Sequence, residues 1–409
     1  MQKGLLTKHF KGVAVKRLTA VETDPSTSNQ HEFNGGVELK KIFGADKATY
    51  PTRFIWLGDE QEAISEDGFI TWYDAREAHP KRSEFRLFYS TTAVMPGLAK
   101  EGDTLFVCVR TEGTTLIIVT PPGSDVESQL AWLFDLPEQP KLSFQAQKIN
   151  SSDDRKSDFA VRYIFDELGI EAEESETDAF DELLMQFGST FPSTKVFSAF
   201  ARSTLPDISA LDNSDDALLE WMQREEFLFK RLERHIVGER LRAGFVSKGE
   251  ADVDGFMHFS LSVQNRRKAR AGAALENHLG HIFSMRKIQV DQGCITENKN
   301  RPDFLFPGCV AYSDPNFPAG SLTMLGAKSS LKDRWRQVLS EAQRISTKHL
   351  ITLSPGISLN QTNEMQTKLL QLVVPAKLHD TYQPIQRSWL MSLTQFIDLV
   401  AKKQRDLEG

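Results

Sequence analysis

The residue types best suited to chemistry stand in two short C-terminal segments. Asp303 starts one apolar run, and Lys328 closes the next. A carboxylate oxygen is the kind of ligand that Mg²⁺ prefers, and a lysine beside the metal can act on the attacking water. A carboxylate and a lysine at the ends of neighbouring strands therefore predict metal-assisted hydrolysis of a phosphodiester.

The two segments begin a PD-(D/E)XK nuclease pattern, but one ligand is missing from it. A second acid normally stands two residues before the lysine, where this chain has Gly326, which has no side chain to offer a metal. The next segment, 331–345, is expected to be a helix with a buried stripe formed by Trp335, Val338, Leu339, Ala342 and Ile345. Glu341 lies on another stripe, where it could complete a metal site with Asp303. By spacing alone, the alternative is a solvated glutamate on a polar helix face.

The elements that must position these residues follow from the hydrophobic pattern. From about residue 266, helix and strand alternate, which favours a mixed central sheet flanked by helices. Residues 214–243 carry an apolar stripe at helical spacing and are expected to form a long helix. The other expected helices are 266–283, 331–345 and 388–402, and the expected strands are 302–306, 322–328, 349–353 and 370–374.

The N-terminal part has a different pattern. Short apolar or alternating runs recur there between turn residues, which favours a β-barrel or a β-sandwich. The expected strands are 13–18, 52–57, 68–73, 85–90, 104–110 and 115–120.

Length and charge distribution agree with separate domains. A chain of 409 residues exceeds one ordinary core, so two or three domains are expected. The net charge is −7, but residues 151–235 hold 20 acidic against 9 basic side chains, so this segment carries −11 and the rest of the chain +4. The flanking parts can therefore present the basic surfaces that nucleic acid requires.

The apolar runs, histidines and cysteines indicate where the protein is located and which metal sites it can form. No apolar run approaches the roughly 20 residues of a membrane span, and the N-terminus has no apolar signal-peptide core. His278 and His281 lie one helical turn apart, but no cysteine or third histidine has a matching spacing, so no zinc site is expected. Reduced thiols and a cytoplasmic protein are expected from three cysteines without metal-binding spacing, Cys108, Cys294 and Cys309.

Three C-terminal segments resemble the EcoRII restriction endonuclease family: residues 265–276 (NRRKARAGAALE), 301–307 (RPDFLFP) and 326–337 (GAKSSLKDRWRQ). In that family and its CCGG-type relatives, the second acidic ligand has moved to the helix, thirteen residues after the lysine, and this position is Glu341 here. The resemblance covers most of residues 185–385. It implies that Asp303 and Glu341 bind Mg²⁺, while Lys328 orients or activates the water.

The same resemblance suggests roles for two more residues near the metal. Glu276 matches a helix glutamate that makes an outer contact to metal or water, and an ordinary helix acid is the alternative. Tyr312 stands where the EcoRII sequence also has a tyrosine, and both catalysis and packing remain open for it.

Candidate DNA contacts form two groups in this part of the chain. Lys332, Asp333 and Arg334 match the family's base-reading cluster, with Arg336 beside them, since arginine suits guanine and an acid can accept from cytosine. An intrahelical ion-pair cluster is the alternative. The second group is a basic run that is expected to contact phosphates or to form a solvated face: Arg266, Arg267, Lys268 and Arg270.

The N-terminal part resembles the family's effector domain, a pseudobarrel that grips DNA with two arms and covers the nuclease cleft until it binds an effector copy. The arms would be residues 16–34 and 74–86 here, although a solvated loop is the alternative for the second, and methylcytosine reading remains open. The candidate DNA-binding residues are Lys16, Arg17, Asn29, Gln30, His31, Glu32, Arg76, His79, Lys81, Arg82 and Arg86.

These observations together predict a multidomain α+β chain. It would comprise an N-terminal β pseudobarrel (1–136), an acidic linker (137–182) and an α/β nuclease domain with a mixed central sheet (183–409), whose helical subregion is 183–260. The expected function is sequence-specific, Mg²⁺-dependent cleavage of double-stranded DNA by a homodimer formed through the C-terminal domain. The alternatives are a non-catalytic DNA-binding regulator with a decayed nuclease domain and a repair or junction nuclease of the same fold.

Overall fold

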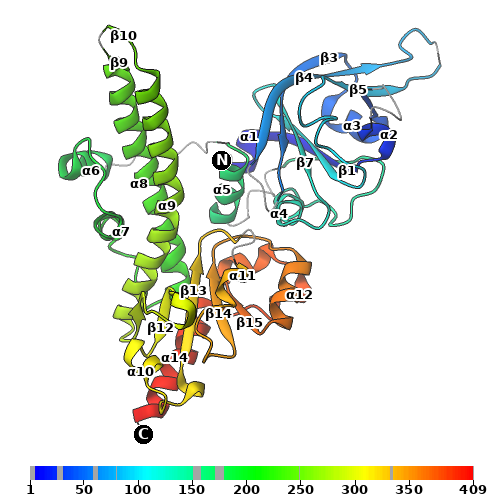
Figure 1. Cartoon of the computed structure of the whole chain (residues 1–409). Coiled ribbons are helices and arrows are strands. Elements are labelled where there is room, and N and C mark those ends of the chain that lie inside the picture. Colours follow the sequence, from blue (N-terminus) through cyan, green and yellow to red (C-terminus); the bar gives the residue numbers. More distant parts are fainter. Residues whose placement is uncertain are drawn as a thin grey trace. The chain divides into compact units, whose positions relative to one another are not determined.

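The computed structural model describes residues 5–24, 31–58, 63–79, 81–150, 158–170, 179–247, 249–331 and 335–408. The chain divides into two compact units (Figure 1). The first unit comprises residues 1–172, 355–362 and 381–383, and the second comprises the remainder. Among the described helices, none combines the length and the apolar character needed to cross a membrane.

Eight strands of the first unit form one curled sheet, in the order β2-β5-β4-β3-β7-β6-β1-β8. Neighbouring strands are antiparallel, except for the parallel pair β3 and β7. The strands are β1 Phe10–Arg17, β2 Glu32–Asn34, β3 Ala48–Trp56, β4 Ile64–Asp74, β5 Phe85–Tyr89, β6 Thr104–Arg110, β7 Thr115–Thr120 and β8 Gln145–Lys148. The helices are α1 Leu5–His9, α2 Ala20–Thr23, α3 Gly36–Phe43, α4 Asp125–Leu133 and α5 Asp158–Glu167.

Both faces of this sheet are buried. Because successive side chains of a strand point to opposite faces, β6 contributes Phe106 and Cys108 to one core and Leu105 and Val107 to the other. The first core also contains side chains of α4 and α5, and the second contains side chains of α3. Because both faces of these strands are buried, their sequences are continuous apolar runs.

Part of the expected acidic linker is structured. β8 pairs with β1, and α5 buries Val161, Ile164 and Phe165 in the first core. The boundary between the two units falls after residue 172, within the segment 137–182.

A five-stranded mixed sheet lies in the second unit, in the order β11-β12-β13-β14-β15. β12 is antiparallel to both of its neighbours, β11 and β13, and β13, β14 and β15 are parallel. The strands are β9 Val246–Ser247, β10 Glu250–Ala251, β11 Asp291–Gln292, β12 Phe304–Phe306, β13 Thr323–Lys328, β14 Lys348–Thr352 and β15 Leu370–Val373. The helices are α6 Ala179–Phe187, α7 Thr194–Ser203, α8 Ser214–Ala243, α9 Val253–Met285, α10 Cys309–Ser313, α11 Trp335–Val338, α12 Leu359–Thr367, α13 Pro384–Arg387 and α14 Leu393–Glu408, with 3₁₀ turns at Glu297–Lys299, Ala319–Ser321 and Ala376–Thr381.

The long helices α8 and α9 run side by side as a hairpin that ends in β9 and β10 (Figure 1). The expected helix 214–243 is confirmed, because Asn213 caps its first turn by accepting from the Asp216 N–H and Gly244 ends it with a φ of +78°. The expected helix 266–283 is too short, since α9 already begins at Val253. The closing helix is shifted towards the C-terminus, from 388–402 to Leu393–Glu408.

Candidate active site

Asp303 and Lys328 meet where β12 begins and β13 ends. The two strands are antiparallel neighbours with Phe304 opposite Leu325, so the residue before β12 lies beside the end of β13. The Asp303 carboxylate accepts hydrogen bonds from the Ala327 N–H at 2.6 Å and from Lys328 Nζ at 2.9 Å. The structure therefore brings together the first two residues of the predicted motif.

Two more carboxylates interact electrostatically with this pair. Burial, followed by the charge of Asp303, raises the pKa of Glu341 to about 7, against the opposing effect of Lys328 and Lys348. Burial and the charge of Asp303 also raise the pKa of Glu276, which α9 contributes. Glu341 and Glu276 therefore both lie close enough to Asp303 for its charge to disfavour their ionised forms, and a cation would relieve this repulsion.

The donor set fits Mg²⁺. One oxygen of Glu341, Oε2, is buried without a hydrogen-bond partner among the residues that the structure describes. A buried carboxylate oxygen is costly unless it is paired. Mg²⁺ takes oxygen ligands, often one or two carboxylates with several waters, so a metal held by Asp303 and Glu341 would satisfy this atom.

At Gly326, where the pattern normally has an acid, neighbouring side chains leave no room for a carboxylate. A Cβ at this glycine would lie 3.0 Å from Val338 Cγ2 and 3.4 Å from Leu350 Cδ1. A carboxylate side chain there would push against α11, which carries Val338. The second acid therefore has to come from another segment, and Glu341 stands three residues after the end of α11.

The segment that carries Glu341 is not the expected helix 331–345. α11 includes only Trp335–Val338, and the N–H groups of residues 339–341 bond to carbonyls three residues earlier. Ala342 then adopts a φ of +46°, a left-handed conformation that interrupts a right-handed helix. The helix prediction is therefore wrong beyond Val338, although four residues of its stripe are buried: Trp335, Val338, Ala342 and Ile345.

Tyr312 makes its polar contact with Glu297, a residue that was not predicted from the sequence. Its hydroxyl donates to Glu297 Oε1 at 2.8 Å and Oε2 at 2.6 Å. Burial, and then this hydrogen bond, raises the pKa of Tyr312 to about 12, so the hydroxyl stays protonated at neutral pH. The geometry supports positioning by Tyr312. Glu297 gave no sequence signal because it is a single acid in a polar, aperiodic loop.

The basic run on α9 mainly joins α9 to α8. Arg270 is only 6% exposed, ion-pairs with Glu225 and Glu226, and stacks over the Phe229 ring at 4.5 Å. A guanidinium buried in this way is not placed to contact a phosphate, so the prediction of a phosphate contact is not retained for Arg270.

The neighbouring members of the run differ in their contacts. Arg267 is exposed, and its Nε bonds to Glu233 at 2.6 Å. Arg266 is also exposed and stacks over the Phe191 ring at 4.0 Å. The side chain of Lys268 lies outside the described part of the structure.

The predicted base-reading cluster, Lys332, Asp333 and Arg334, lies outside the described residues. Arg336, which was grouped with it, is exposed on α11. It ion-pairs with Glu364 of α12 at 3.0 Å and stacks over the Trp335 ring at 4.8 Å.

His278 belongs to a buried network between helices. Its Nε2 lies 2.9 Å from Glu225 Oε2, and its Nδ1 lies 2.9 Å from Arg202 Nη1. Burial lowers its pKa, although Glu225 opposes this shift. These contacts connect α7, α8 and α9, so they give His278 a structural role.

In the first unit, several predicted DNA-binding residues have partners within the protein. Lys16 is 5% exposed and paired with Glu22, so the prediction that it faces DNA is wrong for this structure. Arg17 ion-pairs with Glu127 at 2.8 Å and donates to the Gly102 carbonyl at 3.3 Å. Both residues stabilise the end of β1.

A second network surrounds the other predicted arm. Glu32 accepts from Tyr73 and from Arg86, and Glu84 pairs with both Arg86 and Arg76. His31 is half-buried against the Tyr89 ring, with 5.4 Å between ring centroids, whereas Asn29 and Gln30 lie outside the described residues. His79, Lys81 and Arg82 are exposed in the β4–β5 connection, where Arg76 and Glu77 are exposed as well.

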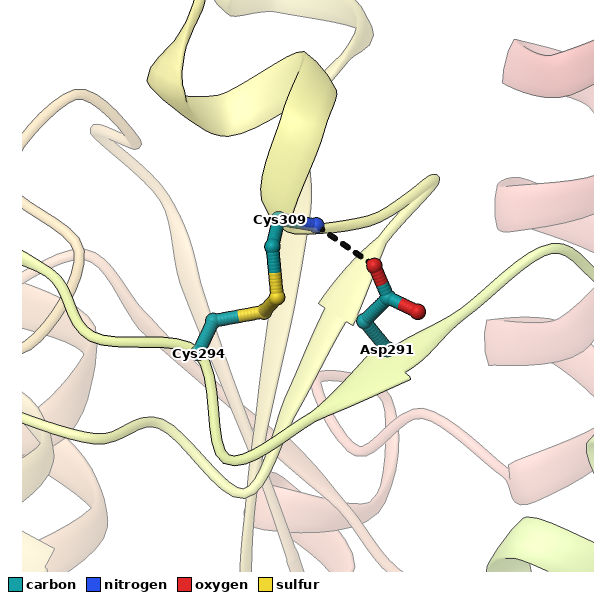
Figure 2. A group of neighbouring side chains, drawn as sticks. All are labelled: Asp291, Cys294 and Cys309. Carbon is teal, nitrogen blue, oxygen red and sulfur yellow. Dashed lines mark hydrogen bonds between the residues drawn. A yellow bond between two sulfur atoms is a disulfide. The ribbon is translucent and has the colours of Figure 1, made fainter.

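The expectation of three reduced cysteines is wrong for this structure. Cys294 and Cys309 form a disulfide, with 5.5 Å between their Cα atoms (Figure 2). Cys108 is free and buried. Asp291 lies beside the pair and accepts from the Cys309 N–H at 2.8 Å. The bridge closes a loop that contains Asp303. Although the ligand atoms of these three residues lie within 4.8 Å of one another, the bonded sulfurs are not available as thiolate ligands.

The carboxylate cluster lies in a part of the chain that matches known proteins. Residues 229–397 match the family described as EcoRII C terminal. The type II restriction enzyme EcoRII of Escherichia coli is 44% identical over 184 residues, which are 45% of this chain and 44% of that enzyme. The chain therefore spans less than half the length of the curated relative that it matches.

Two solved structures of Ecl18kI, metal-depleted and in complex with uncleaved DNA, are also similar. In one of them the DNA is modified. Their TM-scores are 0.45 for the complex with modified DNA and 0.43 for the other, and each is 20% identical to this chain, covering 56% of it and 84% of the matched chain. The family match includes Glu276, Asp303, Lys328 and Glu341. Residues 229–397 of this chain are thus similar to the EcoRII C-terminal family, and the carboxylate cluster lies within this similar segment.

Proposed function

We propose that this protein is a sequence-specific endonuclease of restriction type that hydrolyses phosphodiester bonds of double-stranded DNA with Mg²⁺. The observation that carries the proposal is the meeting of Asp303, Lys328 and Glu341 at one end of the mixed sheet, within the part that matches the EcoRII family. A decayed site would not be expected to keep a buried carboxylate oxygen that has no partner among the described residues and lies near the charge of Asp303, because that arrangement is unfavourable without a cation.

Each residue of the cluster has a distinct proposed role. Asp303 and Glu341 would hold the metal, which when bound supplies positive charge for the scissile phosphate and acidifies a water. Lys328, whose ammonium lies 2.9 Å from Asp303, orients or activates the attacking water beside the ligand. Glu276 of α9 would contact the metal or its waters.

DNA is the proposed partner, and a homodimer is the proposed assembly. A double-strand break requires two cuts on antiparallel strands, and one carboxylate–lysine site per chain suits a two-fold pair of chains formed through the second unit. Arg266, Arg267 and Lys268 remain candidates for phosphate contacts. Lys332, Asp333, Arg334 and Arg336 remain candidates for reading the sequence.

The first unit is proposed to bind DNA as a sensing domain, acting either as an effector site or as a methylcytosine reader. Its support is the exposed β4–β5 connection, where His79, Lys81 and Arg82 face solvent beside the network of Arg76 and Arg86. Long-range attraction to phosphates requires basic side chains of this exposed kind.

The test of the proposed activity is cleavage of unmethylated and methylated genomic DNA in Mg²⁺, followed by sequencing of the ends. We expect ends that share one short sequence. Ends without a common sequence, or cleavage confined to branched DNA, would contradict a restriction function and favour a structure-directed nuclease.

Removing two of the exposed cations of the β4–β5 connection, Lys81 and Arg82, should weaken DNA binding in a salt-dependent way. Each lost phosphate contact reduces the slope of log K against log salt by about 0.9, so Lys81→Ala with Arg82→Ala should reduce it by about 2 and lower affinity several-fold. The measurement is fluorescence anisotropy at several salt concentrations. Lys47→Ala, which removes another exposed lysine of the same unit, is the control. Equal slopes for the double variant and the control would assign DNA binding to other residues.

A further inference from the structure

The turn that carries Glu341 depends on side chains outside its own segment. α11 ends at Val338, and the residue after Glu341, Ala342, has a left-handed φ of +46°. A non-glycine residue in this region is strained, and such a conformation persists only where surrounding groups enforce it. The groups that enforce it therefore determine where the Glu341 carboxylate lies.

On one side, the 3₁₀ turn Glu297–Lys299 and the residue before it contact the backbone that follows Glu341. Glu297 Oε2 accepts from the Gln343 N–H at 3.1 Å, and Thr296 Oγ1 accepts from the Ala342 N–H at 3.4 Å. Glu297 is itself fixed by the hydroxyl of Tyr312, at 2.8 Å and 2.6 Å from its two oxygens.

On the other side, a buried lysine holds the carbonyl groups of the same turn. Lys348, at the start of β14, is 7% exposed and donates from Nζ to the carbonyls of Ala342 at 3.2 Å and Ile345 at 2.9 Å. Thr296 and Glu297 therefore bind N–H groups of the turn, and Lys348 binds its carbonyl groups, so both kinds of backbone group are held in place.

Arg344 anchors the far end of the turn. Its guanidinium donates to the carbonyls of Asp314 at 2.9 Å and Phe317 at 2.8 Å, and also to that of Tyr312. The segments that carry Glu297 and Tyr312 are in turn joined covalently, because the Cys294–Cys309 disulfide stands three residues before each of them.

We propose that Glu297 and Lys348 are positioning residues that hold the turn bearing Glu341 in the metal site, and that Tyr312 fixes Glu297 for this role. The proposal rests on the proposed nuclease function, because it assigns Glu341 as a metal ligand. None of the three residues is required to touch the metal or the DNA. Glu297 and Tyr312 act on the metal site through the backbone of residues 341–345, whereas Lys348 acts through this backbone and also through its charge near Glu341.

The most selective test is Tyr312→Phe, which removes one hydroxyl and retains the ring. Supporting contacts of metal ligands typically change metal affinity or activity by about tenfold to a hundredfold. We expect the Mg²⁺ concentration for half-maximal cleavage to rise about tenfold in this variant and in Glu297→Gln, with the rate restored by excess metal. DNA binding in Ca²⁺ should not change, because the DNA-contacting residues are untouched.

The matched control is Tyr89→Phe, which removes a hydroxyl bonded to the Glu22 carbonyl at 3.1 Å in the first unit. This variant should lose stability without any change in the metal requirement. Lys348→Met is expected to resemble Glu297→Gln, but it removes a buried charge and can fail to fold, so the two milder variants carry the test. If Tyr312→Phe and Glu297→Gln cleave with the wild-type metal requirement, the positioning role is wrong.

Binding of Mn²⁺ measured by calorimetry separates this inference from the proposed activity. If the wild type binds Mn²⁺ more tightly than Tyr312→Phe but cuts no DNA, the positioning role stands and the nuclease function fails. If the wild type cuts DNA and both proteins bind Mn²⁺ equally, the nuclease function stands and the positioning role fails.

Discussion

Asp303→Asn and Glu341→Gln should each lower the rate of DNA cleavage at least about a thousand-fold while leaving DNA binding intact, because the developing charge on the phosphate then loses its counter-charge. Both substitutions keep the size of the side chain and remove only its charge. Lys328→Met should have a similar effect, since its ammonium lies 2.9 Å from Asp303. Cleavage of a plasmid and electrophoretic mobility in Ca²⁺ measure the two properties separately.

A control and a double variant make the assignment of the second ligand specific. Glu220→Gln, an exposed glutamate of α8, should cleave at the wild-type rate. Adding Gly326→Asp to Glu341→Gln should not restore activity, because a side chain at residue 326 has only 3.0 Å to Val338. If Glu341→Gln alone retains wild-type activity, the second ligand is another acid, and Glu276 is the next candidate.

The elements that the sequence predicted best are those determined by their own residues. α8 and strands β6 and β7 have the expected bounds, since an apolar stripe with a capped start, or a continuous apolar run between turns, is a local pattern. Asp303 and Lys328 were found for the same reason, because each stands at the end of such a run.

The turn around Glu341 could not be predicted, because distant residues determine its shape. Its apolar stripe suited a helix, but the backbone donates a hydrogen bond to Glu297 and accepts one from Lys348. These residues lie 44 positions before and 7 positions after Glu341. Propensity over a short segment is a weak preference that tertiary contacts of this kind override.

The charged residues show a second limit of sequence patterns. Lys16 and Arg270 were expected to face DNA, because basic runs usually lie on the surface, but both are buried beside acids from other segments. The pairing of Cys294 with Cys309 depends likewise on β11 and β12, whose antiparallel pairing brings the two cysteines together. Neither these ion pairs nor the disulfide can be predicted from the residues next to them in the sequence.

The metal affinity of the wild-type protein should fall steeply below pH 7. Burial, and then the charge of Asp303, raises the pKa of the Glu341 carboxyl to about 7, so protons and metal compete for the same oxygens. Affinity should be nearly constant above this pH and fall about tenfold per unit below it, hence about a hundredfold at pH 5. Calorimetric Mn²⁺ titrations between pH 5 and pH 8 measure this. An affinity that stays constant across the range would contradict a raised pKa at the ligand.

The same pKa makes an opposite prediction for the stability of the metal-free protein. Since the folded pKa of about 7 lies above the ordinary value of 4.5, the folded state binds more protons than the unfolded state between these pH values, and stability decreases as the pH rises. Glu341→Gln should therefore match the wild type near pH 4 and exceed its unfolding free energy at pH 8, by about 2 kcal/mol after allowance for partial solvent screening. Denaturant unfolding in EDTA at the two pH values provides the measurement. Parallel pH profiles for the two proteins would show that Glu341 is not the acid whose pKa is raised by folding. A Glu341→Gln variant that is inactive yet more stable would show that the metal-free fold is destabilised by the same carboxylate that the metal requires.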